Sequence, residues 1–396
     1  MSLLRGTGDR SGALARIHWR VEGKQSDLLA ALLADPDRVL EGPRSAPRPR
    51  MGRKRFYRLS GAEGEPSLFV KVFTVPAGWP RLRSWLRASK AHREWKVARA
   101  ITERGFEVAA PVAVGEERRH GVLLRSFSII PELPGRDLRA LLQDPSTTSE
   151  QRRALVESFA AYARRLHDAG VDQDDFSPNN FLALRDGGFC LIDFERCHLR
   201  RIPEARRWRM LAKLHRHQLG VSATDRLRFL RAYLGEGAGR RERRRAAECI
   251  RSAFLRVRRH DARRAAHGAL RVGRHVAREG DLWVVKGREG TPTRRLRLRR
   301  REARRVWVLA HQLERLGLPG LPPVRRGPDW VEFEDLGPAD PSADELLAIR
   351  RARDRFSYYG RFVTEPDWLF TPSGPKLGDP RAFRLQLGRR SSYRKR

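Results

Sequence analysis

Three polar residues that lie close together in the sequence have the chemistry that phosphoryl transfer requires. In DQDDFSPNNFLALRDGGFCLIDFE (172–195), Asp175 precedes Asn180 by five residues, and Asp193 ends an apolar run 13 residues after Asn180. Phosphoryl transfer needs a carboxylate near the acceptor hydroxyl, together with an amide and a carboxylate that hold Mg²⁺ against the phosphates. The spacing therefore predicts this chemistry. The alternative is an Asx-turn in a surface loop.

Scarce residue types strengthen this prediction. Asn179 and Asn180 are the only two asparagines among 396 residues, and only 9 of the 83 basic residues are lysines. Lys71 stands in the strand-like run SLFVKVF, where a compact ammonium suits contact with the α- and β-phosphates. Glu94 follows 23 residues later in a predicted helix and can hold Lys71 in place. The alternative is a lysine at a strand edge and an exposed helical Glu94.

The predicted elements come in an order that can position these residues. Two short strands are predicted between residues 56 and 73, and a helix over 89–104 that Gly105 ends. The later predicted elements are strands at 108–115 and 120–130, a turn and helix at 131–142, a helix at 150–169, a hairpin at 181–194 and basic helices over 203–260. A strand-rich segment followed by a helical one predicts an α+β fold.

Several stretches resemble one known family. The string LHDAGVDQDDFSPNNFLAL, followed by CLIDFERC, resembles the lipopolysaccharide kinase family, a branch of the protein-kinase-like superfamily that includes Kdo kinases and WaaP-type heptose kinases. PELPGRDLRALL, ARRWRMLAKLHR and DRLRFLRAYLG fit the same branch, and the resemblance covers residues 50–240.

The resemblance implies a fold and a reaction. The fold is bilobal and protein-kinase-like, with a β-rich N-lobe at 46–132 and a helical C-lobe at 133–260, after an N-terminal extension and linker at 1–45. The implied reaction uses ATP and Mg²⁺, and its acceptor is a sugar hydroxyl of the lipid A–core.

The resemblance also assigns a role to each candidate residue. Asp175 matches the catalytic base, and Asn180 and Asp193 match the metal-binding pair. The residues matched to ATP binding are Lys71, its partner Glu94 and, in PELPGRDLRALL at the lobe hinge, Glu132.

The sequence departs from the kinase pattern in three places. Gln173 stands where many kinases have a His that supports the catalytic loop. The motif that begins at Asp193 is Asp-Phe-Glu, without a Gly in third position, as is common in this branch. The segment RPRMGRKRFYRL (48–59) is a poor Gly-rich loop. It has a single glycine, Gly52, and its candidates for phosphate contact are Arg53, Lys54 and Arg55.

The second half of the chain echoes the first. Residues 278–324 contain a strand that ends in Lys286, a helix, a Gly and a Pro-bearing strand, like the region around Lys71. Further on, TEPDWLF (364–370) and KLGDPRAF (376–383) echo SPNNFLA and CLIDFERC.

These echoes predict that residues 261–396 form an additional basic α+β region, a degenerate second kinase-like copy. In that copy Lys286 matches Lys71, and Glu302 matches Glu94 with a displacement of one helical turn. The region has no asparagine, so a metal site of the Asn180 kind is incomplete there. The alternative is an unrelated basic α+β tail.

Composition sets the broad class of the chain. A length of 396 residues with 40% hydrophobic residues predicts two domains with real cores. Three cysteines, none in a CxxC pair, suit a reducing cytosol and argue against a disulfide framework or structural zinc. The start of the chain lacks the apolar run of a signal peptide, and no 18 consecutive residues are apolar, so no membrane-spanning helix is expected.

The formal net charge of +36 attracts polyanions. Basic residues cluster after the predicted metal-binding hairpin, at the start of a basic helical region over 200–264, and the cluster consists of Arg200, Arg201, Arg206, Arg207, Arg209 and Lys213. Beside an anionic glycolipid acceptor, this cluster predicts peripheral attachment to an anionic membrane surface. The alternative is that these side chains only solvate a helix.

The sequence therefore predicts an ATP-dependent kinase, cytoplasmic or peripheral on the cytoplasmic face of the inner membrane. Its predicted acceptor is a sugar hydroxyl of the lipopolysaccharide inner core, Kdo or heptose. One alternative keeps the fold but changes the acceptor to a protein or small molecule. Another is a non-enzymatic basic protein that binds nucleic acid. The second is less favoured because the basic residues are dispersed and no RNP-like, zinc-finger or helix-turn-helix signature occurs.

Overall fold

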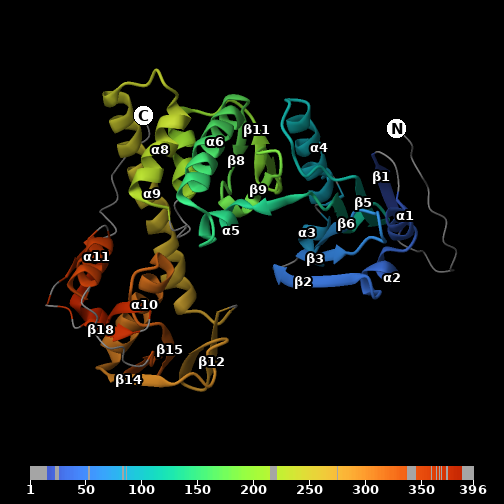
Figure 1. Cartoon of the computed structure of the whole chain (residues 1–396). Coiled ribbons are helices and arrows are strands. Elements are labelled where there is room, and N and C mark those ends of the chain that lie inside the picture. Colours follow the sequence, from blue (N-terminus) through green and yellow to red (C-terminus); the bar gives the residue numbers. More distant parts are fainter. Residues whose placement is uncertain are drawn as a thin grey trace, which may run out of the picture. The chain divides into compact units, whose positions relative to one another are not determined.

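The computed structural model describes residues 16–22, 26–51, 54–82, 84–85, 87–214, 221–273, 275–336, 345–357, 359–362, 364, 366, 368–371 and 373–385. The chain is a mixture of β-sheets and helices (Figure 1). It divides into two compact units, Met1–Arg251 and Ser252–Arg396, here called the N-terminal and C-terminal units. None of the helices in these residues has both the length and the apolar character needed to cross a membrane.

The N-terminal unit begins with a six-stranded antiparallel sheet in the order β1-β5-β6-β4-β3-β2. Its strands are β1 (Arg16–Val21), β2 (Ser45–Met51), β3 (Lys54–Leu59), β4 (Leu68–Thr74), β5 (Ala113–Arg119) and β6 (Val122–Pro131). Successive side chains of a strand point to opposite faces. On β4, Val70 and Val72 therefore face one side of the sheet, and Lys71 and Phe73 face the other.

Two short helices, α1 (Asp27–Ala34) and α2 (Pro36–Glu41), precede β2. Three leucines of α1 pack in one apolar cluster with Val70 and Val72. Residues upstream of position 46 thus supply two helices and strand β1, and β2 starts at Ser45. The segment predicted as an extension and linker over residues 1–45 thus contributes a strand to the first sheet, because β1 joins β5 nearly a hundred residues later.

The other face of the sheet carries α4 (Lys90–Thr102), which follows the short helix α3 (Trp79–Leu82). The Ser89 side chain caps the start of α4 by accepting the His92 N–H at 3.1 Å. Gly105 follows the helix with φ +79°, a value that glycine adopts without steric cost. Trp95 packs with Phe73 in a buried cluster between helix and sheet. The helix predicted over 89–104 is confirmed, and it lies on the face to which Lys71 points.

The rest of the N-terminal unit is mainly helical. Its helices are α5 (Leu138–Gln143), α6 (Ser149–Asp168), the 3-10 turn η1 (Pro178–Asn180), α7 (Glu204–Leu214), α8 (Ala223–Leu234) and the start of α9 (Arg240–Ala269). Its short strands are β7 (Gly135–Asp137), β8 (Val171–Gln173), β9 (Phe181–Leu184), β10 (Phe189–Leu191) and β11 (Cys197–Leu199). The predicted hairpin is confirmed as β9–β10, and β8 pairs with β11. Phe159 of α6 packs with Phe176 and Phe181 beneath the loop that holds Asp175.

The C-terminal unit has a five-stranded sheet in the order β12-β13-β15-β16-β14. These strands are β12 (Val276–Glu279), β13 (Leu282–Val285), β14 (Thr293–Arg297), β15 (Pro323–Arg326) and β16 (Trp330–Glu334). The remaining elements are α10 (Arg300–Leu316), α11 (Glu345–Ser357), β17 (Gly360–Phe362), β18 (Trp368–Thr371), β19 (Gly374–Leu377), the 3-10 turn η2 (Pro380–Ala382) and β20 (Phe383–Leu385).

Strand pairing follows one scheme in both units. The sequence β4-α4-β5-β6 forms a sheet in the order β5-β6-β4, and β14-α10-β15-β16 forms one in the order β15-β16-β14. Later in each unit an outer strand pair encloses a hairpin, β8–β11 around β9–β10 and β17–β20 around β18–β19. An isolated parallel bridge joins the segment after each helix to the end of the hairpin, Val108 to Leu191 and Gly320 to Leu377. The units differ in the strand to which one hairpin is joined. In the C-terminal unit the hairpin β12–β13 pairs with β15, the strand after the helix, whereas in the N-terminal unit the hairpin β2–β3 pairs with β4, the strand before the helix.

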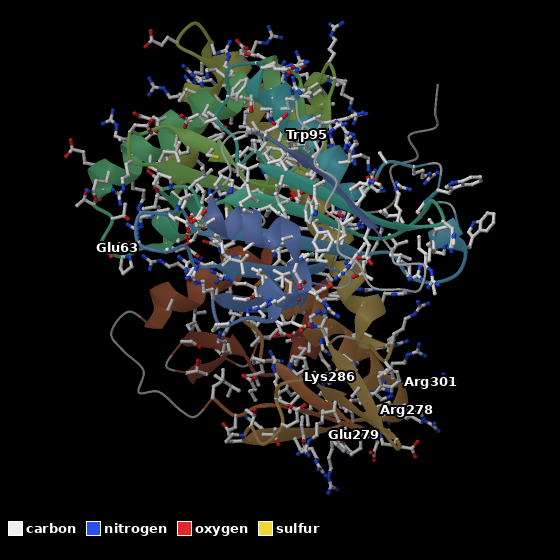
Figure 2. The ribbon with its side chains drawn as sticks, turned by 90° about the vertical axis from the view of Figure 1, so that its right-hand side faces the viewer. Glu63, Trp95, Arg278, Glu279, Lys286 and Arg301 are labelled. Atoms are coloured by element: carbon white, nitrogen blue, oxygen red, sulfur yellow. The ribbon has the colours of Figure 1, made fainter. Side chains whose placement is uncertain are left out.

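This difference overturns the match of Lys286 to Lys71. Lys286, labelled in Figure 2, follows β13 and is exposed, while the strand that precedes α10 is β14. Ser128 of β6 pairs with Lys71 on one side and with Val114 on the other. Val114 is the ninth residue after Gly105, the glycine that follows α4. The ninth residue after Gly317, the glycine that follows α10, is Arg326, which pairs with Val331 of β16. On its other side Val331 pairs with Leu296 of β14, so Leu296 takes the position of Lys71.

Candidate active site

Lys71 and Glu94 form a buried ion pair between β4 and α4. Lys71 Nζ lies 3.4 Å from Glu94 Oε2, and the two side chains are 13% and 2% exposed. Burial raises the pKa of Glu94, and the charge of Lys71 opposes that rise. The second carboxylate oxygen of Glu94 is buried and has no hydrogen-bond partner in the described part of the chain. The lysine is thus held in place by a carboxylate that water does not reach.

The same lysine faces the loop that follows β10. Lys71 Nζ lies 3.9 Å from Asp193 Oδ1, and Asp193 is partly exposed. Asp193 Oδ1 accepts the Glu195 N–H at 3.1 Å, which orients the carboxylate within a tight turn. The backbone N–H of Ile192 donates to the carbonyl oxygen of Asn180 at 3.0 Å. Asp193 is therefore close both to the lysine and to η1.

Asp175 and Asn180 belong to one hydrogen-bonded loop. The Asn180 side-chain amide donates to the carbonyl oxygen of Asp175 at 2.7 Å, and the Ser177 N–H donates to the same oxygen at 2.8 Å. The loop turns back on itself over Phe176, which is buried. The structure thus brings together five of the six sequence-predicted site residues: Lys71, Glu94, Asp175, Asn180 and Asp193.

Gln173 connects the two loops of the site. It is 1% exposed, its amide N–H donates to the carbonyl oxygen of Asp193, and its amide oxygen accepts the Asp175 N–H at 3.1 Å. An amide side chain supplies a donor and an acceptor at the same time and at any pH. Gln173 therefore joins Asp175 to Asp193 without the histidine expected from the kinase pattern.

Basic side chains of α7 hold the other side of the Asp175 loop. Arg206 donates to the buried carboxylate of Asp172 at 2.8 Å and to Asp174 at 3.0 Å, and Lys213 Nζ lies 3.2 Å from Asp174. Burial opposes ionisation of Asp174, but the hydrogen bond from Arg206 and the charge of Lys213 outweigh it, so the pKa of Asp174 lies below its ordinary value. The loop is thus clamped by ion pairs.

These ion pairs change the interpretation of the basic cluster after the hairpin. Arg200 and Arg206 bind Asp172, Lys213 binds Asp174, and Arg207 binds Asp168. Four of the six clustered cations therefore face carboxylates of their own unit. The sequence could not show this, because their partners lie 28 to 39 positions away.

A second group of lysines lies near Asp193. Lys54 of β3 and Lys90 at the start of α4 both bind the carboxylate of Glu195, with Lys90 Nζ 2.8 Å away. Burial lowers the pKa of Lys54. Lys90 and Glu195 were not predicted as functional residues, although the scarcity of lysine was a usable signal: four of the nine lysines, Lys54, Lys71, Lys90 and Lys213, gather around the site.

The predicted phosphate-contact residues have separate outcomes. Gly52 and Arg53 lie outside the described residues. Lys54 and Arg55 are neighbours on a strand and so face opposite sides of the sheet. Lys54 reaches Glu195, whereas Arg55 acts on Asp37 of α2, whose pKa is lowered mainly by a hydrogen bond from Arg125. Of the described candidates, Lys54 is the one on the side of Lys71.

Glu132 follows β6, and its carboxylate is already engaged. Arg58 of β3 donates to both of its oxygens, from Nε at 3.0 Å and from Nη2 at 2.7 Å. This hydrogen bonding lowers the pKa of Glu132. Glu132 therefore ties the end of β6 to β3 and is not among the groups that surround Lys71.

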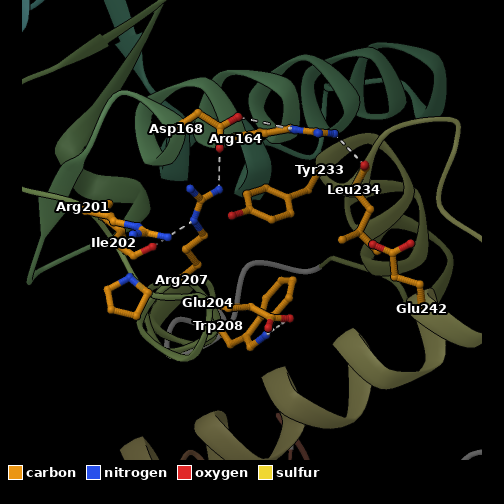
Figure 3. Close-up of a pocket in the computed structure, with 11 residues that line it drawn as sticks. Arg164, Asp168, Arg201, Ile202, Glu204, Arg207, Trp208, Tyr233, Leu234 and Glu242 are labelled. Atoms are coloured by element: carbon orange, nitrogen blue, oxygen red, sulfur yellow. Dashed lines mark hydrogen bonds and ion pairs between the residues drawn. The ribbon is translucent and has the colours of Figure 1, made fainter.

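A pocket of about 380 Å³ lies among α6, α7, α8 and the start of α9 (Figure 3). Trp208 and Tyr233 supply its aromatic lining, and Asp168 pairs with Arg207 at its edge. None of the predicted site residues lines it. The hydroxyl of Tyr233 lies 2.8 Å from Nδ1 of the buried His167.

The residues of the site fit a magnesium ion that shares its coordination with phosphate. Across the described ranges, no cluster of three or more His, Cys, Asp or Glu side chains could hold a metal alone. Asn180 and Asp193 offer one amide and one carboxylate, which are hard oxygen donors. Mg²⁺ is commonly held by one or two carboxylates together with substrate phosphates and water. The donor set therefore suits an ion that arrives with a nucleotide.

Comparison with known proteins gives a consistent result. The model of the lipopolysaccharide kinase (Kdo/WaaP) family matches residues 81–233. The lipopolysaccharide core heptose(I) kinase WaaP of Pseudomonas aeruginosa is 32% identical over 185 residues, which cover 42% of this chain and 68% of that protein. The 3-deoxy-D-manno-octulosonic acid kinase of Vibrio cholerae is 27% identical over 149 residues, 37% of this chain and 57% of that protein.

A solved structure, WaaP in complex with acyl carrier protein, aligns with 60% of this chain and 97% of that chain, at 25% identity and a TM-score of 0.45. The family-model match contains Glu94, Asp175, Asn180 and Asp193, and the Pseudomonas relative exceeds 30% identity over two thirds of its own length. The chain belongs to the lipopolysaccharide kinase (Kdo/WaaP) family.

Proposed function

We propose that the protein transfers the γ-phosphoryl group of ATP to a sugar hydroxyl of the lipopolysaccharide inner core, on Kdo or heptose. One observation carries this proposal. Lys71 Nζ lies 3.4 Å from Glu94 Oε2 and 3.9 Å from Asp193 Oδ1, beside the loop of Asp175 and Asn180. The names of the relatives support the sugar acceptor. The same geometry would serve a protein or small-molecule acceptor, so the acceptor is the part to be tested.

The strand-rich part (16–131) and the helix-rich part (132–251) of the N-terminal unit would act as the two lobes of a protein-kinase-like fold. In this arrangement ATP lies between them. Lys71 of the strand-rich part, positioned by Glu94, binds the α- and β-phosphates. Lys54 and Lys90 supply further positive charge where the chain lacks a Gly-rich loop, and Glu195 places both of them near Asp193.

Asp175 and the metal-binding pair would act on the acceptor side. Asp175 orients the sugar hydroxyl and accepts its proton as the new oxygen–phosphorus bond forms and the bond to ADP breaks, so the products are a phosphosugar and ADP. Asn180 and Asp193 would hold Mg²⁺, which neutralises charge on the phosphates when it is bound. Gln173 keeps the two loops in register, because it contacts the backbone of both Asp175 and Asp193.

The C-terminal unit would be a second copy of this scaffold that has lost the ion pair. Glu94 lies eleven positions before Gly105, and Val306 lies eleven positions before Gly317, so Val306 takes the position of Glu94. Leu296 takes the position of Lys71, and both Leu296 and Val306 belong to one apolar cluster. Glu302, the predicted counterpart of Glu94, instead caps its own helix by accepting the Arg299 N–H at 3.2 Å.

Other positions support the duplication. The helix residues at matching positions are buried in both copies: Ala91 and Ala303, Trp95 and Trp307, Ala98 and Ala310, Ile101 and Leu313. Asp379 stands two residues after Leu377, as Asp193 stands two after Leu191, and it accepts the N–H two residues later in the same way. A copy without the lysine and its partner would bind or stabilise rather than transfer phosphate.

An acceptor assay tests the proposed function. Purified protein and its Asp175→Ala variant would be incubated with γ-labelled ATP, Mg²⁺ and one of three acceptors: Kdo-bearing lipid A, heptose-bearing core lipopolysaccharide, or casein. We expect transfer to one of the glycolipids, with turnover lowered roughly 10²–10⁴-fold in Asp175→Ala. Transfer to casein alone would favour the protein-acceptor alternative, and an unaffected Asp175→Ala variant would contradict the assignment.

A further inference from the structure

Two tryptophans on the strand-rich part are exposed to solvent. Trp79 is 69% exposed and Trp85 is 66% exposed, the highest values among the large apolar side chains that the structure describes. Single exposed apolar residues are ordinary, but two on one short segment form a patch that calls for an explanation. They lie on either side of the end of α3, between the strand of Lys71 and the helix of Glu94.

The segment that carries them is basic. Residues 75–90, VPAGWPRLRSWLRASK, contain three arginines, one lysine and no acidic residue. The neighbouring turn between β5 and β6 adds Arg119 and His120, which are exposed. Unlike the cations of α7, Arg87 and Arg119 form no ion pair among those found in the described residues. The patch therefore combines indole rings with the charges of Arg87 and Arg119, for which the described residues show no ion pair, whereas Lys90 at the end of the segment is bound to Glu195.

The backbone around Trp85 is fixed to the sheet. Arg118 of β5 donates to the carbonyl oxygens of Gly121 at 2.8 Å and of Ser84 and Arg87 at 3.4 Å each. Ser84 Oγ accepts the Leu123 N–H at 3.1 Å. The backbone at Ser84 and Arg87 is thus held against the β5–β6 hairpin.

Gly121 fixes the indole of Trp85. A Cβ added at Gly121 would lie 2.5 Å from Trp85 Nε1, and Gly121 has φ +79°. The indole therefore packs edge-on over the glycine at the tip of the β5–β6 hairpin while most of its ring stays exposed. A side chain at position 121 would push Trp85 off this surface.

We propose that the surface formed by Trp79, Trp85, Arg87 and the turn Arg119–Gly121, here called the platform, is the one by which the protein rests on an anionic lipid bilayer. Trp side chains favour the headgroup region, because the ring is apolar and its N–H needs a polar partner. Basic side chains next to them contact lipid phosphates. The inference rests on the proposed function, since a glycolipid acceptor requires the enzyme to work at a membrane.

A bilayer fits this surface better than a protein or nucleic acid. Interfaces with proteins enclose their aromatic anchors in pockets, whereas both indoles stand on open surface. Single-stranded nucleic acid is bound in grooves that track its backbone, and neither of the two pockets formed mainly by the helix-rich part lies at this platform. A flat anionic surface with an apolar interior matches two projecting indoles flanked by arginines.

Vesicle flotation tests the proposal and needs neither ATP nor acceptor, so its outcome is independent of the kinase assignment. Full-length protein would be mixed with vesicles of phosphatidylcholine, alone or with phosphatidylglycerol. We expect binding to the anionic vesicles that weakens with salt, and a partition coefficient lowered about tenfold or more in Trp79→Ala/Trp85→Ala. Leu227→Ala, which removes another exposed apolar side chain (54% exposed) from α8, is the matched control and should bind like the wild type.

Quenching by bromine-labelled lipids supplies a second readout. Fluorescence of the wild type should be quenched by brominated anionic vesicles, and that of the double variant should not. Gly121→Ala should reduce quenching in part, because it displaces Trp85. The proposal would be overturned by equal flotation of the wild type and the double variant, or by equal binding to neutral and anionic vesicles. It would also be overturned if the double variant lost self-association while it kept vesicle binding. Circular dichroism melts of all variants confirm that the fold is retained.

Discussion

The side chain of Gln173 donates a hydrogen bond to the carbonyl oxygen of Asp193 while it accepts the backbone N–H of Asp175. One neutral amide thus sets the distance between the loop of the proposed base and the loop of the proposed metal ligand. A charged or shorter side chain could not make both contacts, because a cation has no acceptor and an alanine has neither group.

Gln173→Ala should therefore slow the reaction while leaving ATP binding close to normal. We expect kcat to fall roughly 10- to 100-fold, the scale of a small misplacement of reacting groups. Gln173→His should restore activity at high pH, where neutral imidazole can donate and accept, and lose it as the ring protonates. The measurement is kcat against pH for the three proteins. A Gln173→His profile parallel to that of the wild type would show that the bridge does not matter.

Lys71 and Lys286 offer a direct contrast. Lys71 is buried against Glu94, whereas Lys286 is exposed after β13. Lys71→Ala should lower kcat/KM roughly 10²- to 10³-fold, the usual cost of losing a donor aimed at developing charge. Lys286→Ala should leave it unchanged. Both variants would be assayed with one acceptor and matched thermal melts. Equal losses would contradict the assignment of the active site to the N-terminal unit.

Residue type and local spacing were enough to predict Lys71, Glu94, Asp175, Asn180 and Asp193. All five belong to short segments with a clear local pattern, and the rarity of Lys and Asn marked two of them, Lys71 and Asn180. Their catalytic roles stay predictions until the assays are done.

Contacts across long stretches of sequence could not be predicted in this way. Lys90 reaches Glu195 across 105 positions, and Arg206 reaches Asp172 across 34. No periodicity reports which carboxylate a given arginine will meet, and the chain has 83 basic residues from which to choose.

The C-terminal unit shows the same limit. Lys286 and Lys71 look alike in sequence, but the equivalence of strands depends on which edge of the sheet a hairpin joins. Because β13 pairs with β15 and β14 pairs with β16, the strand before the helix carries Leu296. Sheet order, which local sequence does not encode, decided that comparison.

Replacement of Arg206 should lower the stability of the protein as well as its activity. Its guanidinium binds Asp172, which is 1% exposed, and Asp174, next to the proposed base. Arg206→Ala leaves a buried carboxylate short of a partner and should lower the free energy of unfolding by about 3 kcal/mol. Arg209→Ala, an exposed neighbour on the same helix, should change it by less than about 0.5 kcal/mol. Urea denaturation of both variants checks this. Similar midpoints would mean that the α7 clamp adds little.

Arg206→Lys separates charge from geometry. Lysine keeps the positive charge but lacks the planar fork that reaches two carboxylates at once. We expect it to recover part of the stability and little of the activity, because Asp174 would be held less firmly. Full recovery of both would show that charge alone is sufficient at this position.

His167 makes the stability of the helix-rich part depend on pH. The side chain is fully buried beside Tyr233 and Phe176, and burial lowers its pKa from 6.5 to about 3. Between these values the unfolded chain carries a proton on His167 that the folded protein does not. The neutral histidine is therefore tolerated fully above pH 6.5, and stability is lost as the pH falls toward 3.

His167→Gln keeps a polar contact for the Tyr233 hydroxyl but cannot take up this proton. We expect the free energy of unfolding of the wild type to fall faster with acid than that of the variant, by up to about 1.4 kcal/mol per pH unit below the unfolded pKa. Urea titrations of both proteins over the acidic range measure the difference, and other acid-sensitive groups cancel in it. Parallel slopes would show that His167 is solvated or protonated in the folded state. Since Phe176 lies next to Asp175, activity should decline over the same range in which the wild type loses stability.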